Sequence, residues 1–303
     1  MIYTVTLNPA LDYVMQVNHL QFGLTNRSAC EELYVGGKGI NVSMLLKQLN
    51  QPTTVLGFIA GFTGEAIKNE LERLEIPTDL IPLSSGLSRI NVKLKGDQET
   101  EINGCGPTVS EQDFIKLLNG MDELNEQDFL ILSGSIPAGL ASDSYVRMME
   151  IASSKGARIV VDTAGENLRK CLPHRPFLIK PNRQEVEELL SITIDPDRGD
   201  QLTDAARQLQ QAGAVNVLIS LGGDGAFLLD ENGNSHRMPA AKGIPINTVG
   251  AGDSMIAGFV TAIANGEDYT QALRLATACG SATAFSQGIA DAKAIQRVLT
   301  TLN

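Results

Sequence analysis

Residues 247–254 read Asn-Thr-Val-Gly-Ala-Gly-Asp-Ser and lead directly into an apolar run, Met255–Ile263. Gly250, Ala251 and Gly252 can turn the backbone tightly enough to aim several N–H groups at one point. The helix predicted for the apolar run adds the partial positive charge of its N-terminus. The stretch therefore predicts an anion hole of the kind that stabilises a phosphoryl group during its transfer.

Asp253 lies in the first turn of that predicted helix, where it is placed to accept the proton of an attacking hydroxyl. The positive helix end favours the ionised carboxylate, so we expect Asp253 to be a weak base. Weak basicity suffices if the transition state is loose, because the nucleophile then loses its proton late. The alternative is an aspartate that only caps a core helix.

Short apolar runs recur along the rest of the chain, each bounded by Gly, Pro or polar residues, and they predict buried strands. These runs are Ile2–Leu7, Thr53–Ile59, Phe129–Leu132, Arg158–Asp162, Phe177–Ile179, Val215–Ser220 and Gly225–Leu229. Amphipathic segments between many of them predict helices at Ile40–Leu49, Gly64–Leu74, Glu111–Leu118, Ser144–Ser154, Glu185–Leu190 and Asp204–Gln211. This alternation predicts an α/β fold with a mostly parallel sheet and helices on both faces. Ligands of such sheets bind beyond the carboxyl ends of the strands.

Two stretches break the alternation of strands and helices. Residues 12–36 contain no convincing helix, and in Arg89–Lys95 apolar and polar side chains alternate with period two. We therefore predict a small antiparallel sheet, a lid formed by residues 12–36 and 86–106. It would project from a core made of residues 1–11, 37–85 and 107–303. Its apolar face needs cover, most simply from a second copy of the chain; the alternative is two surface loops.

A second glycine-rich stretch, Gly36-Gly37-Lys38-Gly39-Ile40-Asn41, opens the first predicted helix. It is not a Walker A loop, because Gly39 stands where Ser or Thr should follow the Gly-Lys pair. It offers backbone N–H groups, the Lys38 ammonium and the Asn41 amide to a polar ligand. The alternative is a glycine-rich loop that binds nothing.

Polar residues follow two further predicted strands. Asp12 comes after the first strand and could accept hydrogen bonds from sugar hydroxyls, although Asp soon after a proline is also typical of a turn. Ser133-Gly134-Ser135 follows another strand. It offers small hydroxyls and N–H groups to a ligand bound at the same edge of the predicted sheet.

Two more loops are candidates for metal and nucleotide contacts. Asn182 and Glu185, three residues apart, could hold Mg²⁺ through bound water. The same spacing also makes a helix capping box. The stretch Ser220-Leu-Gly-Gly-Asp-Gly225 joins two predicted strands and could clamp a nucleotide by backbone contacts, or be an ordinary turn.

The composition of the chain restricts the classes of molecule that it is expected to bind. Its 303 residues include 24 Lys and Arg against 35 Asp and Glu, and the net charge of −11 disfavours nucleic acid and anionic membranes. The four cysteines lie far apart and the three histidines are scattered, which argues against a disulfide framework or a zinc centre. No signal peptide is visible. The most apolar helical run has about half of the roughly 20 residues that a bilayer span needs. We expect a cytoplasmic globular protein.

The order and spacing of three motifs resemble a known family. An early Gly-Gly-Lys-Gly-x-Asn, a mid-chain Asn-x-x-Glu and a late Gly-Ala-Gly-Asp look like the ribokinase-like sugar kinases of the PfkB family, over essentially the whole chain. Within that family the chain is most similar to kinases of fructose 1-phosphate, with kinases of tagatose 6-phosphate next. The segments that carry this likeness are Ser88–Leu94, Ile179–Arg183, Thr248–Met255 and Leu273–Ala278.

This resemblance implies a three-layer α/β/α body and a β lid that pairs across a homodimer. The implied reaction uses ATP and Mg²⁺ to phosphorylate the C6 hydroxyl of fructose 1-phosphate, giving fructose 1,6-bisphosphate and ADP. Asp253 would be the base, and the backbone of Gly250, Ala251 and Gly252 would stabilise the phosphoryl group.

The resemblance also implies binding positions. Asp12, Gly37 and Asn41 would hold sugar hydroxyls, and Lys38, Arg89 and Arg27 would neutralise the phosphate of the sugar. Asn91 shares a strand face with Arg89 and is expected in the same cleft, with Gly134. Asn182 and Glu185 would organise Mg²⁺ through water. The nucleotide site would be lined by Ser220, Gly222, Gly225, Gly252 and Ser281 and would include Asn182.

Two other functions stay open. One is a kinase for an unphosphorylated sugar or a nucleoside, against which Lys38 and Arg89 together argue. The other is a non-catalytic sensor of sugar phosphates or nucleotides on the same fold. A sensor would have no use for Asp253 at the mouth of an anion hole.

Overall fold

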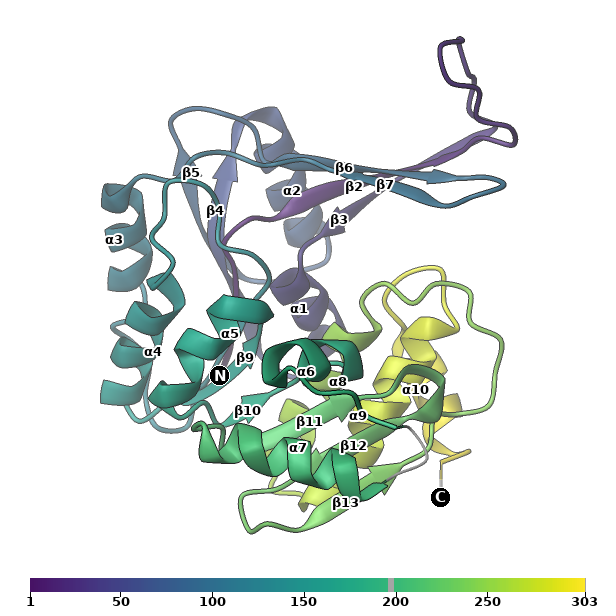
Figure 1. The fold of residues 1–303 in the computed structure, drawn as a ribbon. Helices are drawn as coiled ribbons and strands as arrows, with labels where there is room; N and C mark the ends of the chain where they lie inside the picture. The colour runs from purple at the N-terminus through teal and green to yellow at the C-terminus, as the bar shows by residue number, and fades with distance from the viewer. Residues whose placement is uncertain (196–198, 303) are drawn as a thin grey trace.

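A computed structural model describes residues 1–195 and 199–302 and contains one large sheet of nine strands (Figure 1). The order across the sheet is β13-β12-β11-β10-β9-β8-β1-β4-β5, parallel except at β12 and β13. The strands are β1 (Ile2–Thr6), β4 (Thr53–Ala60), β5 (Thr78–Leu83), β8 (Phe129–Ser133), β9 (Arg158–Asp162), β10 (Leu178–Ile179), β11 (Asn216–Ser220), β12 (Ala226–Leu229) and β13 (Ser235–Met238). The predicted α/β class is confirmed.

Helices cover both faces of this sheet, so the body has three layers. One face carries α3 (Glu111–Asn119), α4 (Ser144–Ser154), α5 (Gly165–Cys171), α6 (Arg183–Leu190) and α7 (Gly199–Gln211). The other carries α1 (Lys38–Gln48), α8 (Ala251–Ala264), α9 (Tyr269–Ala284) and α10 (Ala292–Leu299). The pleat of β8 shows the division: Leu130 and Leu132 pack on the first set of helices, and Phe129 and Ile131 on the second.

Helix α2 (Gly61–Arg73) packs beside β4 and β5, where Ile67 and Leu71 join a third apolar cluster with Leu11 and Val35. Single 3-10 turns follow α5 (Leu172–His174) and β11 (Gly222–Asp224).

A second sheet of four strands projects from the body at the top of Figure 1. Its order is β3-β2-β6-β7, with β2 (Ala10–Gln16), β3 (Cys30–Gly36), β6 (Arg89–Lys95) and β7 (Thr100–Asn103). The prediction of a purely antiparallel sheet is wrong, because β2 and β6 pair in parallel. Both strands leave the body in the same direction, β2 directly after β1 and β6 after β5, so their neighbouring edges run parallel.

Several predicted elements agree with the structure closely, while the edge strands β5 and β13 were not predicted. Strand β9 and helix α4 begin and end where the sequence predicts. Strands β5 and β13 lie at the edges of the large sheet, and every residue of β5 is partly or fully exposed. An edge strand needs few buried side chains, so hydrophobic patterning does not reveal it.

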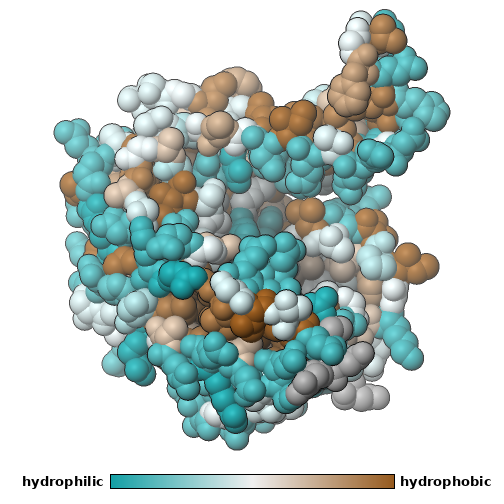
Figure 2. All heavy atoms as spheres, in the orientation of Figure 1, coloured by the Kyte–Doolittle hydropathy of each residue, from teal (hydrophilic) through white to brown (hydrophobic). Residues whose placement is uncertain are grey.

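The carboxyl ends of the parallel strands meet beneath the small sheet. Ser133, Asp162 and Ser220 end β8, β9 and β11, and α8 begins near the same edge. In Figure 2 the surface is hollowed between the projecting sheet and the body. In the described part of the chain, no helix has the length and apolar character needed to cross a membrane.

The packing of the core predicts that truncating two nearby phenylalanines will have very different effects on the free energy of unfolding. Phe58 of β4 is fully buried, whereas Phe62, four residues on in α2, is 70% exposed. We expect Phe58→Ala to lower the free energy of unfolding by about 3–5 kcal/mol, because it leaves a cavity in close-packed surroundings. The matched control, Phe62→Ala, should change it by about 0.5 kcal/mol or less. Denaturant titration measures both, and equal losses would contradict this packing.

Candidate active site

A cavity of about 480 Å³, here called the reaction cleft, lies between the small sheet and the carboxyl edge of the large sheet. The small sheet and α1 contribute Asp12, Gly37, Lys38, Asn41, Arg89, Asn91, Lys93, Glu101 and Asn103. The body contributes Asp162, Lys180, Asn182, Glu185, Ser220, Val249, Gly250, Gly252 and Asp253. Most predicted sugar, metal and catalytic positions therefore share one cavity. A larger groove of about 690 Å³ adjoins it under β3 but includes neither Asp162 nor Asp253.

The predicted glycine turn opens into this cleft. Gly250 is the N-cap of α8 with φ of 79°, a left-handed conformation that glycine adopts at little cost. The N–H of Ala251 already donates to the Thr248 carbonyl at 3.2 Å. The anion hole therefore consists of the first-turn N–H groups of Gly252 and Asp253, which have no carbonyl four residues earlier within the helix.

Asp253 is not a helix cap. Its side chain is 6% exposed, and its Oδ2 accepts a hydrogen bond from Asn41 Nδ2 at 2.8 Å. The expectation of a carboxylate made weakly basic by the helix end is wrong. Burial, and then the nearby Asp162 carboxylate, raise the pKa of Asp253 to about 6. Contacts from Asn41, Lys38 and Lys180 oppose this rise but do not outweigh it, so Asp253 is better matched to a general base near neutral pH.

Asp162, which the sequence analysis did not single out, is the charge centre of the cleft. Its carboxylate is 4% exposed and pairs with Lys38 Nζ at 3.0 Å and Lys180 Nζ at 3.4 Å. Burial alone would raise the pKa of Asp162, but the two ammonium groups outweigh it and hold the pKa below its usual value. The signal was present, because an aspartate ends a buried strand at the edge where ligands bind.

Lys180 is a second candidate site residue that the sequence analysis missed. A Cβ atom added at Gly252 would lie 2.8 Å from Lys180 Nζ, so any side chain there would displace the ammonium group. Lys180 is buried at the end of β10, directly before the Asn182 loop. A buried cation therefore lies beside the anion hole. Both backbone N–H groups and an ammonium group can stabilise negative charge at this point.

The small sheet offers a polar face to the cleft. Asp12 accepts from Asn91 Nδ2 at 2.8 Å and pairs with Lys93 Nζ at 3.1 Å. Asn91 Oδ1 is buried and has no hydrogen-bond partner among the described residues. Such an acceptor is costly to leave unpaired, and a ligand hydroxyl would satisfy it. Ile90 is 39% exposed on the opposite face, as the period-two pattern predicts.

A second cavity of about 400 Å³, here called the anion pocket, adjoins the reaction cleft and shares Gly37, Lys38 and Arg89 with it. It is lined by Thr6, Asn8, Gly37, Lys38, Arg89, Ser133, Gly134, Ser135, Thr163, Ala164 and Asn167. Arg89 is held by a hydrogen bond from its Nε to the Asn8 carbonyl at 3.1 Å. Two cations and several hydroxyls suit a small anion such as a phosphate ester.

The Asn182–Glu185 motif forms the capping box that was the alternative to a metal role. Asn182 Oδ1 accepts from the Glu185 N–H at 2.8 Å, and Glu185 Oε2 accepts from the Asn182 N–H at 2.8 Å. Both residues nevertheless line the reaction cleft, and the box engages only one oxygen of Glu185. The described residues contain no group of three His, Cys, Asp or Glu that could hold a metal alone. One carboxylate fits Mg²⁺, which keeps several waters and takes further ligands from phosphates.

The residues predicted to line the nucleotide site do not all face a cavity. Ser220 lines the reaction cleft, whereas Gly222, Gly225 and Ser281 line neither of the two cavities. Gly225 has φ of 95°, and a Cβ there would lie 2.0 Å from the Met238 carbonyl, so close packing is enough to require a glycine whether or not a nucleotide binds nearby. Ser281 Oγ accepts from the Ala241 N–H at 3.3 Å and so ties the 241 loop to α9.

The position of Arg27 differs from the expectation that it contributes to the phosphate site. It lies in the 17–29 arm beyond the end of β2, is exposed, and lines neither cavity (Figure 1). The arm leaves the small sheet at the end far from α1, which carries Arg27 away from the cleft of its own chain.

Comparisons with known proteins identify a family and several similar chains. The model for the pfkB family carbohydrate kinase matches residues 5–295. A 1-phosphofructokinase of Bacillus subtilis is 42% identical over 99% of this chain and 97% of that protein. A D-tagatose-1-phosphate kinase of Bacillus licheniformis is 39% identical over 96% of this chain and 95% of that protein. The crystal structure of phosphofructokinase-2 from Escherichia coli with substrates and products has a TM-score of 0.93 at 26% identity, covering 99% of each chain.

These findings correct one expectation. The tagatose kinase that matches is named for the 1-phosphate, where the motifs suggested kinases of the 6-phosphate. Motifs such as Gly-Ala-Gly-Asp serve phosphoryl transfer and do not encode which carbon of the sugar already carries phosphate. With a family model matched across residues 5–295 and relatives aligned over nearly the whole chain, this protein belongs to the pfkB family of carbohydrate kinases.

Proposed function

We propose that the protein transfers the terminal phosphoryl group of ATP to the C6 hydroxyl of fructose 1-phosphate, giving fructose 1,6-bisphosphate and ADP. The observation that carries this proposal is the pair of cavities that share Gly37, Lys38 and Arg89. One contains the candidate base Asp253, and the other is a cationic pocket for a phosphate. The named activity of the Bacillus subtilis relative supports the same acceptor.

The acceptor would span both cavities. Lys38 and Arg89 would bind its phosphate in the anion pocket, while Asp12 and the unpaired Asn91 Oδ1 would take hydroxyls in the reaction cleft. In its furanose form a ketohexose 1-phosphate carries C1, with the phosphate, and C6, with the free hydroxyl, on the two ring carbons that flank the ring oxygen. Binding at the anion pocket would therefore direct the C6 hydroxyl toward Asp253.

The residues around Asp253 would carry the chemical step. Asp253 accepts the hydroxyl proton while the C6 oxygen forms a bond to the terminal phosphorus and the bond to the bridging oxygen of ADP breaks. The N–H groups of Gly252 and Asp253 and the Lys180 ammonium stabilise the charge on the transferred group. Bound Mg²⁺ would neutralise the phosphates of ATP, and Asn182 and Glu185 would hold it through water. Ser220, Gly222, Gly225 and Ser281 would form the nucleotide side.

D-tagatose 1-phosphate is the second candidate acceptor, because a kinase named for it is 39% identical to this chain. The two sugars differ only in the configuration at C4, and both leave the C6 hydroxyl free. The same pair of cavities would therefore serve both.

We also propose that the small sheet is a lid that pairs with a second copy of the chain. Leu33, Tyr13, Val92 and Ile102 form one row across its four strands, on the face turned away from the cleft. Leu33 is 57% and Ile102 60% exposed in the single chain. A row of apolar side chains with two exposed aliphatic members, on a projecting sheet, favours burial in an interface.

The pKa of Asp253 predicts a pH dependence of the rate. The base must be ionised, so kcat at saturating substrates should be constant above about pH 7 and fall about tenfold per pH unit below a midpoint near 6. Stopped or coupled assays of ADP release between about pH 5 and 8 measure this profile.

Asp253→Asn is the control for that profile, because phosphate esters also titrate near pH 6. The variant should lose about 10²- to 10⁴-fold in kcat, with the KM for ATP little changed. A variant that keeps the wild-type rate would exclude Asp253 as the base.

A substrate panel tests the acceptor. We expect fructose 1-phosphate and tagatose 1-phosphate to be phosphorylated with far higher kcat/KM than fructose 6-phosphate or fructose. Arg89→Ala should lower kcat/KM for fructose 1-phosphate by about 10- to 100-fold, as the loss of a charged hydrogen bond does, and leave fructose little affected. The control Arg237→Ala changes an exposed residue of β13 and should have no effect. Preference for fructose, or equal losses on both sugars, would refute the phosphate site.

A charge introduced into the apolar row of the small sheet tests the proposed dimer. Ile102→Glu should shift the protein from dimer to monomer in sedimentation analysis, because a carboxylate cannot be buried unpaired in an apolar interface. Ile115→Glu, at a residue of α3 that is 44% exposed, should leave the assembly unchanged. A wild-type protein that sediments as a monomer at micromolar concentration would contradict the proposal.

A further inference from the structure

Tyr145 of α4 lies directly behind the anion pocket and has no part in the mechanism above. Its side chain is 1% exposed, and its hydroxyl donates to the carbonyls of Ser133, at 2.9 Å, and Gly134, at 3.2 Å. Burial raises the pKa of Tyr145 above the usual value for a phenol, with smaller contributions from Cys171 and Asp162. The phenol therefore stays protonated and acts as a donor to both carbonyls.

Hydrogen bonds hold both the carbonyl and the N–H group of Gly134. Its carbonyl also accepts from Thr163 Oγ1 at 3.2 Å, and its N–H donates to the Asp162 carbonyl at 3.2 Å. Gly134 has φ of 89°, a conformation that other residues adopt only under strain. The turn after β8 is therefore a defined structure, anchored to the core by Tyr145 and to β9 through Asp162 and its neighbour Thr163.

These anchors determine the direction of the next N–H group. In a trans peptide the N–H points opposite to the carbonyl, and the N–H that follows the Gly134 carbonyl belongs to Ser135. Because Tyr145 draws that carbonyl toward the core, the Ser135 N–H is turned the other way. Gly134 and Ser135 both line the anion pocket, as do the cations Lys38 and Arg89.

We propose that Tyr145 is a positioning residue for the phosphate of the sugar: it anchors the Ser133–Gly134 turn and so presents the Ser135 N–H to an anion in the pocket. Tyr145 itself touches no ligand. The identity of the anion as the phosphate of the acceptor rests on the function proposed above, whereas the presentation of the N–H group rests on the hydrogen bonds alone.

Tyr145→Phe removes only the hydroxyl and keeps the ring in the core. We expect the KM for fructose 1-phosphate to rise about tenfold, the usual effect of one hydrogen bond, with kcat, the KM for ATP and the KM for fructose within about twofold. A purely structural defect would instead lower stability and alter all of these constants together.

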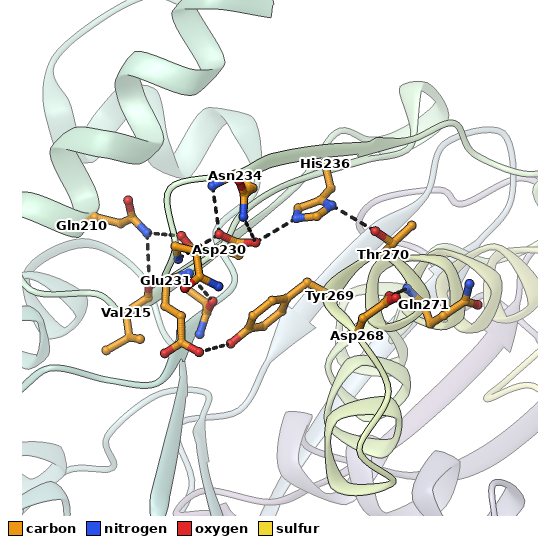
Figure 3. A network of polar contacts seen from close by, with 12 residues as sticks. Gln210, Val215, Asp230, Glu231, Asn234, His236, Asp268, Tyr269, Thr270 and Gln271 are labelled. Carbon is orange, nitrogen blue, oxygen red and sulfur yellow. Dashed lines mark hydrogen bonds and ion pairs between the residues drawn. The ribbon is translucent and has the colours of Figure 1, made fainter.

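Tyr269→Phe is the matched control. The Tyr269 hydroxyl donates to Glu231 Oε1 at 2.8 Å in the polar network of Figure 3, whose labelled residues line neither the reaction cleft nor the anion pocket. It loses the same group and a hydrogen bond of similar length, and all its kinetic constants should stay at wild-type values. If the two variants behave alike, the positioning role is refuted.

A binding measurement separates this role from the proposed function. In amide NMR spectra with inorganic phosphate as the probe, the Ser135 N–H signal should shift on titration of the wild type, and Tyr145→Phe should need about tenfold more phosphate. Thr163→Val, which removes the other side-chain anchor of the Gly134 carbonyl, should act in the same direction if Tyr145→Phe folds poorly. A Ser135 signal indifferent to phosphate overturns the inference. A responding signal in a protein that does not phosphorylate fructose 1-phosphate supports the inference and refutes the function.

Discussion

The site depends on one charge cluster, the buried Asp162 carboxylate between the half-buried Lys38 and the buried Lys180 ammonium groups. Two cations beside the same carboxylate would repel each other, and the negative charge between them reduces that repulsion. The cluster keeps one positive charge beside the anion hole and another at the junction of the two cavities. Burial is the main cause of the raised pKa of Asp253; within the cluster the Asp162 carboxylate adds to this rise, while the two ammonium groups oppose it.

The parallel sheet makes this cluster possible. Strands β8, β9 and β11 end at the same edge, so Ser133, Asp162 and Ser220 come together although they lie far apart in the sequence. The small sheet then closes the other side of the cleft with a polar face, while its apolar face is turned outward. One element therefore serves both the substrate and the proposed partner subunit, because adjacent residues of a strand point in opposite directions.

Sequence reasoning succeeded where the signal is local. The glycine turn before α8, the strand β9 and the alternation in β6 were all predicted, because steric freedom, hydrophobicity and period two act over a few residues. It failed where the answer depends on distant residues. Arg27 has a suitable charge, but its arm lies outside the cleft of its own chain, and the basicity of Asp253 is controlled by burial rather than by the nearby helix end.

The sequence by itself determined the alternation of strands and helices, the turn at residues 250–253 and the polar residues that follow the strands, since each is a property of neighbouring residues. Only the tertiary structure decided that Asp162 lies between Lys38 and Lys180 and that Tyr145 stands behind Gly134. Their electrostatic and hydrogen-bond energies depend on distances through space and on the exclusion of water, and both arise only when the strands are assembled into a sheet.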